Sequence, residues 1–125
     1  MVNTIVKVPF KDVDGFVQSW LLFMQPYHQM TEKEKSVFAA FLVLRIGLLK
    51  SINDESILDE VVLSENSRKS VREKCGISSQ HFQVIMSKLR QKGMIVDNRL
   101  NSKFIPSAMK NNMYQLLFVF MLDDK

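Results

Sequence analysis

Residues Ser64–Lys103 read SENSRKSVREKCGISSQHFQVIMSKLRQKGMIVDNRLNSK, and this stretch decides the fold that the sequence predicts. Two amphipathic segments lie on either side of Gly76, and a short apolar run follows Gly93. Helical spacing places the expected buried contacts of the two segments at Val71, Ile77, Phe82, Ile85 and Leu89. The pattern predicts two short helices around a tight turn, followed by a small hairpin.

The second helix is expected from Ser79 to about Lys92, with Ser78 as its N-cap and Gly93 at its end. Its apolar stripe consists of Phe82, Ile85, Met86 and Leu89, and its opposite face consists of Gln80, Gln83, Ser87 and Gln91. Gln can bind adenine through two hydrogen bonds, and Ser can donate or accept one. Such a helix can enter a DNA groove, or it can serve as a docking surface for a protein.

Positive charge is concentrated in the same stretch. Residues 66–105 hold nine Lys or Arg against Glu73 and Asp97, so this segment carries +7 while the whole chain carries +4. Clustered Lys and Arg attract phosphates and release counterions from duplex DNA, although a solvated basic surface is the plainer alternative. The candidate DNA-binding residues are Arg68, Lys69, Arg72, Ser79, Gln80, Gln83, Ser87, Arg90, Arg99 and Lys103.

The chain up to Gly76 predicts one strand and four helices. Asn3–Val8 alternates and is rich in β-branched residues, as a strand would be, and Pro9 ends it. Helices are expected over Phe16–Met24 with Pro26 as its stop, from a Thr31 capping box with Glu34 to about Lys50, and from Asn53 or Asp54 to Leu63. The next helix is expected to start near Asn66 or Ser67 and to end at Gly76.

The C-terminal part predicts β structure. The expected elements are a strand at Met94–Val96, a polar loop at Asp97–Lys103, a return strand from Phe104 and Ile105, and a polar linker at Ser107–Asn112. Met113–Leu122 is almost wholly apolar, which is typical of a strand buried on both faces. This segment could pair within the chain, and it is also the expected contact with a protein partner or a second copy.

Residues 31–105 resemble the winged helix-turn-helix family, found in bacterial and phage regulators and replication initiators. The resemblance is carried by the TEKEK helix start, the run VREKCGISSQHFQVIMSKLRQKGMIV and the loop NRLNSK. It implies a wing at the hairpin and base contacts from the Ser79 helix. Two departures stand out: Arg72 occupies a position that is usually small, and the outward face of the Ser79 helix has no Lys or Arg before Lys88.

The expected fold is mainly α with a small β-sheet, in one domain over residues 1–125. Its parts are an N-terminal strand and helix (1–30), a winged-helix core (31–105), and a linker with a C-terminal strand (106–125). The chain length suits a single core.

Enzymatic chemistry finds no support in the pattern. His28 and His81 lack ligand neighbours, Cys75 is alone and is expected to pack beside the turn, and the glycines do not form a phosphate loop. No metal or cofactor is therefore expected. We also expect no membrane span and no signal peptide, and a cytoplasmic location, or a virion if a phage encodes the chain.

Two functions remain at this stage. The first is a non-enzymatic protein that binds double-stranded DNA, as a transcription regulator or replication accessory. The second is a structural or interaction subunit of a larger assembly, such as a phage neck or connector ring. The composition, rich in Lys, Asn, Ser and Ile, suggests a phage or low-GC bacterial origin.

Overall fold

The computed structural model describes residues 5–109 and 112–123, and over them the protein is mainly helical with little β structure, as the sequence predicted. The helices are α1 (Val13–Phe23), α2 (Gln25–His28), α3 (Glu32–Leu48), α4 (Glu55–Val62), α5 (Glu65–Cys75) and α6 (Ser79–Gln91). Strands β1 (Ile95–Val96) and β2 (Arg99–Leu100) precede a 3-10 turn, η1 (Ser102–Phe104), and strands β3 (Ser107–Ala108) and β4 (Tyr114–Gln115) follow it.

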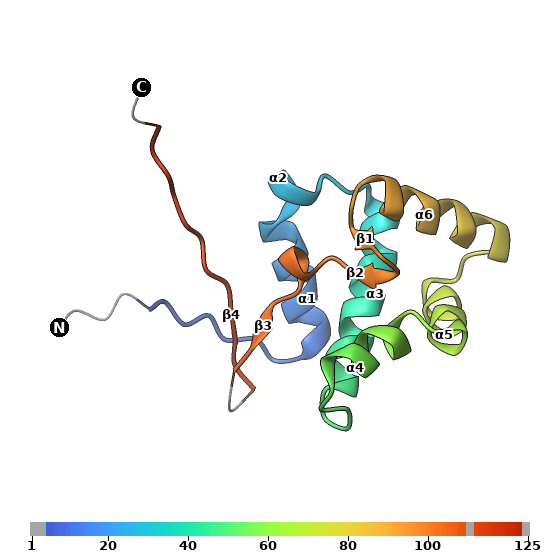
Figure 1. Cartoon of the computed structure of the whole chain (residues 1–125), viewed down its shortest axis with the longest axis horizontal. Helices are drawn as coiled ribbons and strands as arrows, with labels where there is room; N and C mark the ends of the chain where they lie inside the picture. The colour runs from blue at the N-terminus through green and yellow to red at the C-terminus, as the bar shows by residue number, and fades with distance from the viewer. Residues whose placement is uncertain (1–4, 110–111, 124–125) are drawn as a thin grey trace.

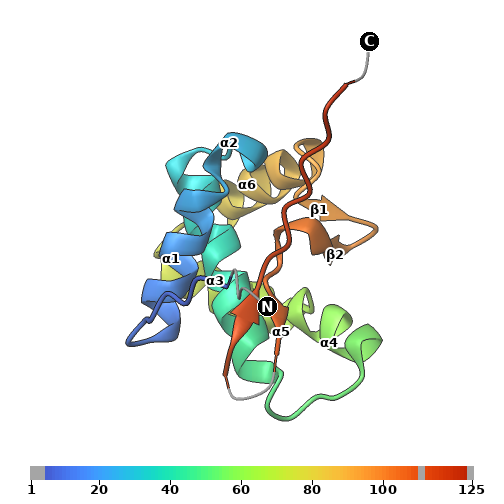
Figure 2. The ribbon, with the colours of Figure 1, turned by 90° about the vertical axis from the view of Figure 1, so that its left-hand side faces the viewer.

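Helix α3 is the centre of the body, and α1, α4, α5 and α6 all pack against it (Figures 1 and 2). Its side chains Phe38, Phe41 and Leu42 are fully buried, because apolar residues cover most of its circumference. The predicted capping box is present: Thr31 Oγ1 accepts from the Glu34 amide, and Glu34 Oε1 accepts from the Thr31 amide. The predicted core helix is confirmed.

The other helix starts follow local chemistry with small shifts in position. Asp54 caps α4, as one of the two expected residues, and Ser78 caps α6 as predicted. Ser64 caps α5, so α5 begins at Glu65 rather than at Asn66 or Ser67. The expectation for Pro26 was wrong: α1 already ends at Phe23, and Pro26 lies in the first turn of α2, where a proline needs no amide hydrogen.

The hairpin after α6 is shorter than predicted. β1 and β2 pair antiparallel, Ile95 with Leu100 and Val96 with Arg99, so only Asp97 and Asn98 form the turn. Both have positive φ, 53° and 58°, as in a type I′ turn whose twist matches the paired strands. The polar loop over Asp97–Lys103 and the return strand from Phe104 were therefore wrong, because η1 occupies Ser102–Phe104.

The C-terminal segment is not a buried strand. Only Tyr114 and Gln115 of the expected Met113–Leu122 strand lie in β4, which pairs with β3, so Ser107–Ala108 is a strand rather than linker. Leu116 and Phe118 still pack against the body, while residues 119–122 extend away from it (Figure 1), and Leu122 is 93% exposed. A buried strand needs a neighbour on each face, and the described body covers only one face of this segment, at Leu116 and Phe118.

The N-terminal strand expected at Asn3–Val8 is also contradicted where it can be compared. Residues 5–10 have no helix or strand and their side chains are exposed, while Asn3 and Thr4 lie outside the described residues. This segment and the C-terminal one leave the body in different directions (Figures 1 and 2). Strand propensity alone could not form a strand, because pairing needs a second strand within hydrogen-bond reach.

Candidate nucleic-acid interface

Helix α6 has one buried and one exposed face, as its spacing predicted. Phe82, Ile85, Met86 and Leu89 are buried, and the Phe82 ring lies 6.4 Å from the ring of Phe41 on α3. The expected outward residues Ser79, Gln80, Gln83 and Ser87 are all exposed. The apolar stripe fastens α6 to α3, so the polar face is open to a ligand.

The turn before α6 sets the direction of that helix. Gly76 ends α5 with a positive φ of 64°, a conformation that costs glycine little, and its amide donates to the carbonyls of Arg72 and Glu73. Two residues later, Ser78 Oγ accepts from the His81 amide at 3.1 Å and starts α6. A tight turn between two capped helices fixes their crossing.

The exposed face of α6 carries no acidic residue. From Gly76 to Val96 the sequence has no Asp or Glu, while Lys88 and Arg90 are exposed and form no ion pair among residues 5–109 and 112–123. Lys92 differs, because its Nζ donates to Glu34 Oε1 at 2.6 Å and to the Gln29 carbonyl at 3.0 Å. Lys88 and Arg90 are the cations of α6 that remain available to an anion.

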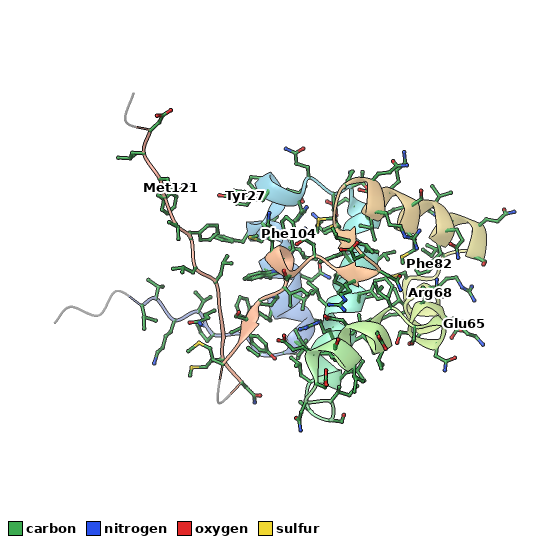
Figure 3. The ribbon with its side chains drawn as sticks, in the orientation of Figure 1. Tyr27, Glu65, Arg68, Phe82, Phe104 and Met121 are labelled. Atoms are coloured by element: carbon green, nitrogen blue, oxygen red, sulfur yellow. The ribbon has the colours of Figure 1, made fainter. Side chains whose placement is uncertain are left out.

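The predicted cations of α5 fall into different environments. Lys69 is exposed and Arg72 is half-buried, and neither forms an ion pair in the described part of the chain. The guanidinium of Arg68, labelled in Figure 3, has its Nε buried without a hydrogen-bond partner there. The neighbouring cation Lys74 has its Nζ 3.6 Å from a carboxylate oxygen of Asp14. Lys69 and Arg72 are therefore the α5 residues best placed for phosphates.

Arg99 and Lys103, the two predicted DNA-binding residues of the hairpin region, differ in how available they are to a ligand. Arg99 lies 3.9 Å from Asp59, and the same carboxylate lies 3.4 Å from Arg45, which is 12% exposed. Arg99 thereby links the hairpin to α4 and is only partly available to a ligand. Lys103, after β2, is exposed and forms no ion pair within the described ranges.

The Asp59 cluster and the Lys92–Glu34 pair were not foreseen from the sequence. The side chain of Asp59 is only 18% exposed, because its carboxylate lies beside both Arg45 and Arg99. One signal was available, since Arg45 is the only charged residue in the apolar run Val37–Leu49 and a buried guanidinium requires a counter-charge. Which carboxylate supplies that charge depends on how α3 and α4 cross, and the sequence pattern does not contain that angle.

The groups set aside as unreactive have structural partners. His28 is buried, with Nε2 2.8 Å from the Leu21 carbonyl and Nδ1 accepting from the Met30 amide at 2.9 Å. Burial lowers the pKa of His28 and raises the pKa of the Cys75 thiol, and both shifts favour the neutral form. No cluster of three metal-binding side chains occurs among residues 5–109 and 112–123.

Comparisons with protein-family models, with curated proteins and with solved structures found no match for this chain. Within the described ranges, no helix has the length and apolar character needed to cross a membrane.

Proposed function

We propose that this protein is a non-enzymatic, double-stranded DNA-binding protein of the winged-helix kind, with α6 entering the major groove. The observation that carries the proposal is the exposed α6 face, which offers Gln and Ser side chains together with Lys88 and Arg90 and has no acidic residue. A helix fixed by one face and free on the other has the form of a recognition helix.

The contacts divide into positioning and reading. Lys69, Arg72 and Arg90 supply phosphate contacts, which contribute most of the affinity and carry no sequence information. Gln80 and Gln83 meet base edges from the first turns of α6. No cation lies on those turns, so phosphate contacts supply most of the affinity and base contacts add only weak discrimination between sequences. Such binding suits a regulator or replication accessory in the cytoplasm.

The test is a titration of labelled duplex DNA, followed by fluorescence anisotropy over a series of salt concentrations. The native chain binds with an affinity that falls steeply as salt rises, because each phosphate contact releases a counterion. Arg90→Ala weakens binding and reduces the slope of log affinity against log salt by about 1. Lys50→Ala is the matched control, since Lys50 is exposed beyond the other end of α3 and carries the same charge.

Two results would contradict the proposal. The first is binding that is absent or does not depend on salt. The second is an equal loss in the Arg90 and Lys50 variants, because that outcome assigns the attraction to net charge and not to α6. Gln83→Ala tests base reading separately: it reduces the preference among sequences and leaves the salt slope unchanged.

A structural or interaction subunit, such as one protomer of a phage neck or connector ring, is the second candidate. The observation that favours it is the exposed apolar segment at residues 116–122, because monomeric proteins rarely expose a continuous apolar surface. DNA binding by α6 and association through this segment use different surfaces, so one chain can do both.

A further inference from the structure

The C-terminal arm, defined here as residues 116–122, is an extended segment with the sequence LLFVFML and no polar side chain. It follows β4, whose Gln115 pairs with Ser107. β3 begins at Ser107, and residues 105 and 106 before it belong to no strand, so the ladder ends at the Ser107–Gln115 pair. No backbone hydrogen bond joins the arm to the described body. The arm is therefore an unpaired strand with its donors and acceptors available.

The inner face of the arm is only half covered. Leu116 and Phe118 are half-buried, and the Phe118 ring lies 5.3 Å from that of Phe23 and 5.9 Å from that of Tyr27. Phe120 and Leu122 belong to the same alternating face but are 87% and 93% exposed, because the arm has passed the end of the body (Figure 3, which labels Met121 and Tyr27).

We propose that the arm pairs antiparallel with the arm of a second copy of this chain, about a two-fold axis at Val119. In this register Phe120 faces Phe118 of the second copy, and Leu122 faces its Leu116. Residues opposite each other in an antiparallel pair point to the same face of the sheet. The exposed inner positions of each arm therefore lie above the body of the other copy.

The surface that receives them is already apolar. Phe23, at the end of α1, and Tyr27, in α2, are each 59% exposed, and both rings lie beside that of Phe118. A hollow at this place is lined by Tyr27, Phe104 and Phe118 among others. Each copy both donates an arm and receives one, which is the requirement for a closed two-fold dimer.

Charge and composition favour a second copy as the occupant. The register brings Asp123 opposite Gln115 of the second copy, beside the exposed Lys103 that lines the same hollow. The seven arm residues carry no charge, so no like charges meet across the pair. If the pairing of the two arms shifted by one residue, Leu117 and Val119, which point away from the body of their own copy, would face the body of the second copy. The contact of Asp123 with Gln115 and Lys103 would then be lost.

Single cysteines in a Cys75→Ser background of the full chain test the register. A residue on the two-fold axis meets its own copy, so Val119→Cys forms a disulfide-linked dimer under mild oxidation. Leu117→Cys and Met121→Cys each remain mostly monomeric alone, yet they cross-link when the two variants are mixed. Equal cross-linking at all three positions, or none at Val119, overturns the proposal.

Light scattering after size exclusion tests the dimer itself. The native chain elutes as a dimer, and Val119→Lys elutes as a monomer over the same concentrations, because two ammonium groups then meet on the axis. Val84→Lys is the matched control, since Val84 is an exposed valine on α6, and it remains dimeric. A monomeric native chain, a larger open assembly, or a Val119→Lys dimer contradicts the inference.

The inference names a second copy as the partner of the exposed apolar segment, and it does not depend on DNA binding. The circular dichroism spectrum of Val119→Lys should match that of the native chain, because residue 119 is 70% exposed and outside the helices. The same variant still binds DNA as a single copy through α6. Failure of the arm pairing and failure of the DNA proposal are therefore seen in different measurements.

Discussion

His28 is a buried side chain whose protonation state follows from its two partners. The Leu21 carbonyl can only accept, so Nε2 carries the hydrogen, and Nδ1 must be bare to accept from the Met30 amide. The neutral ring satisfies both contacts, and a protonated ring would oppose the Met30 amide. Burial is the main cause that lowers the pKa, and the nearby Lys35 and Lys92 act in the same direction.

Stability is expected to fall as the pH drops below about 6.5 and approaches the lowered pKa of His28. The folded chain binds fewer protons at this site than the unfolded chain in that range, so protons favour unfolding. The contribution is complete above the unfolded pKa. Urea unfolding from pH 8 to pH 5 measures the effect, and His28→Gln should remove most of the pH dependence in that window.

The pKa of Glu34 lies below the range from pH 8 to pH 5, so the urea experiment reports on His28 and not on Glu34. Burial alone raises the pKa of Glu34, but the hydrogen bonds from Lys92 and Thr31 together lower it below 4.5. Its contribution is present above pH 4.5 and is lost only as the pH falls through the lowered pKa. A constant free energy of unfolding between pH 8 and pH 5 in the native chain would show that the neutral His28 is not required.

At the scale of single elements, the hairpin depends on two residues in the left-handed conformation. Asn98 has φ 58°, a region that Asn tolerates, Gly adopts freely and β-branched residues avoid. Asn98→Gly should keep or slightly raise stability, and Asn98→Val should lower the free energy of unfolding by about 1–2 kcal/mol. Urea denaturation of both variants measures this, and an equal loss in the two would contradict the type I′ turn.

The same turn shows which elements the sequence could predict. Thr31, Asp54 and Ser78 were foreseen as caps because a cap acts on amides two or three residues away, so the pattern contains both partners. The helical spacing of apolar residues in α6 likewise predicted its exposed face. Asp97 and Asn98 were interpreted as part of a longer polar loop, because neither is Gly and a type I′ turn is recognised mainly by Gly.

Elements that need a distant partner were predicted less well. Residues 5–8 and 116–122 have strand composition, but no neighbouring strand lies beside them in the described body. The ion pairs Lys92–Glu34 and Arg99–Asp59 also join residues far apart in sequence, and they change which predicted cations can reach a ligand. Local sequence patterns thus predicted the helices and the exposed face of α6. Long-range packing determined which charged side chains around that face form ion pairs, and the sequence did not predict this.

At the scale of the whole molecule, the chain divides into a folded body and an arm. Trp20 Nε1 donates to the Phe104 carbonyl at 2.9 Å, so the N-terminal helix is fastened to the segment that follows the hairpin. Beyond that point, β3 and β4 pair with each other and the arm adds only the half-buried Leu116 and Phe118. Stability is therefore expected to reside in the body, and association in the arm.

Deletion of residues 116–125 tests this division. The shortened chain should fold, with the free energy of unfolding lowered by only about 1–3 kcal/mol, because two half-buried side chains are lost. Phe38→Ala in the full chain is the comparison and should cost about 3–5 kcal/mol, since Phe38 is fully buried. Chemical denaturation gives both values, and salt-dependent DNA binding by the shortened chain should persist at the affinity of a single copy. A shortened chain that cannot fold would instead make the arm part of the core, and residues 116–122 would then have to be covered within one copy.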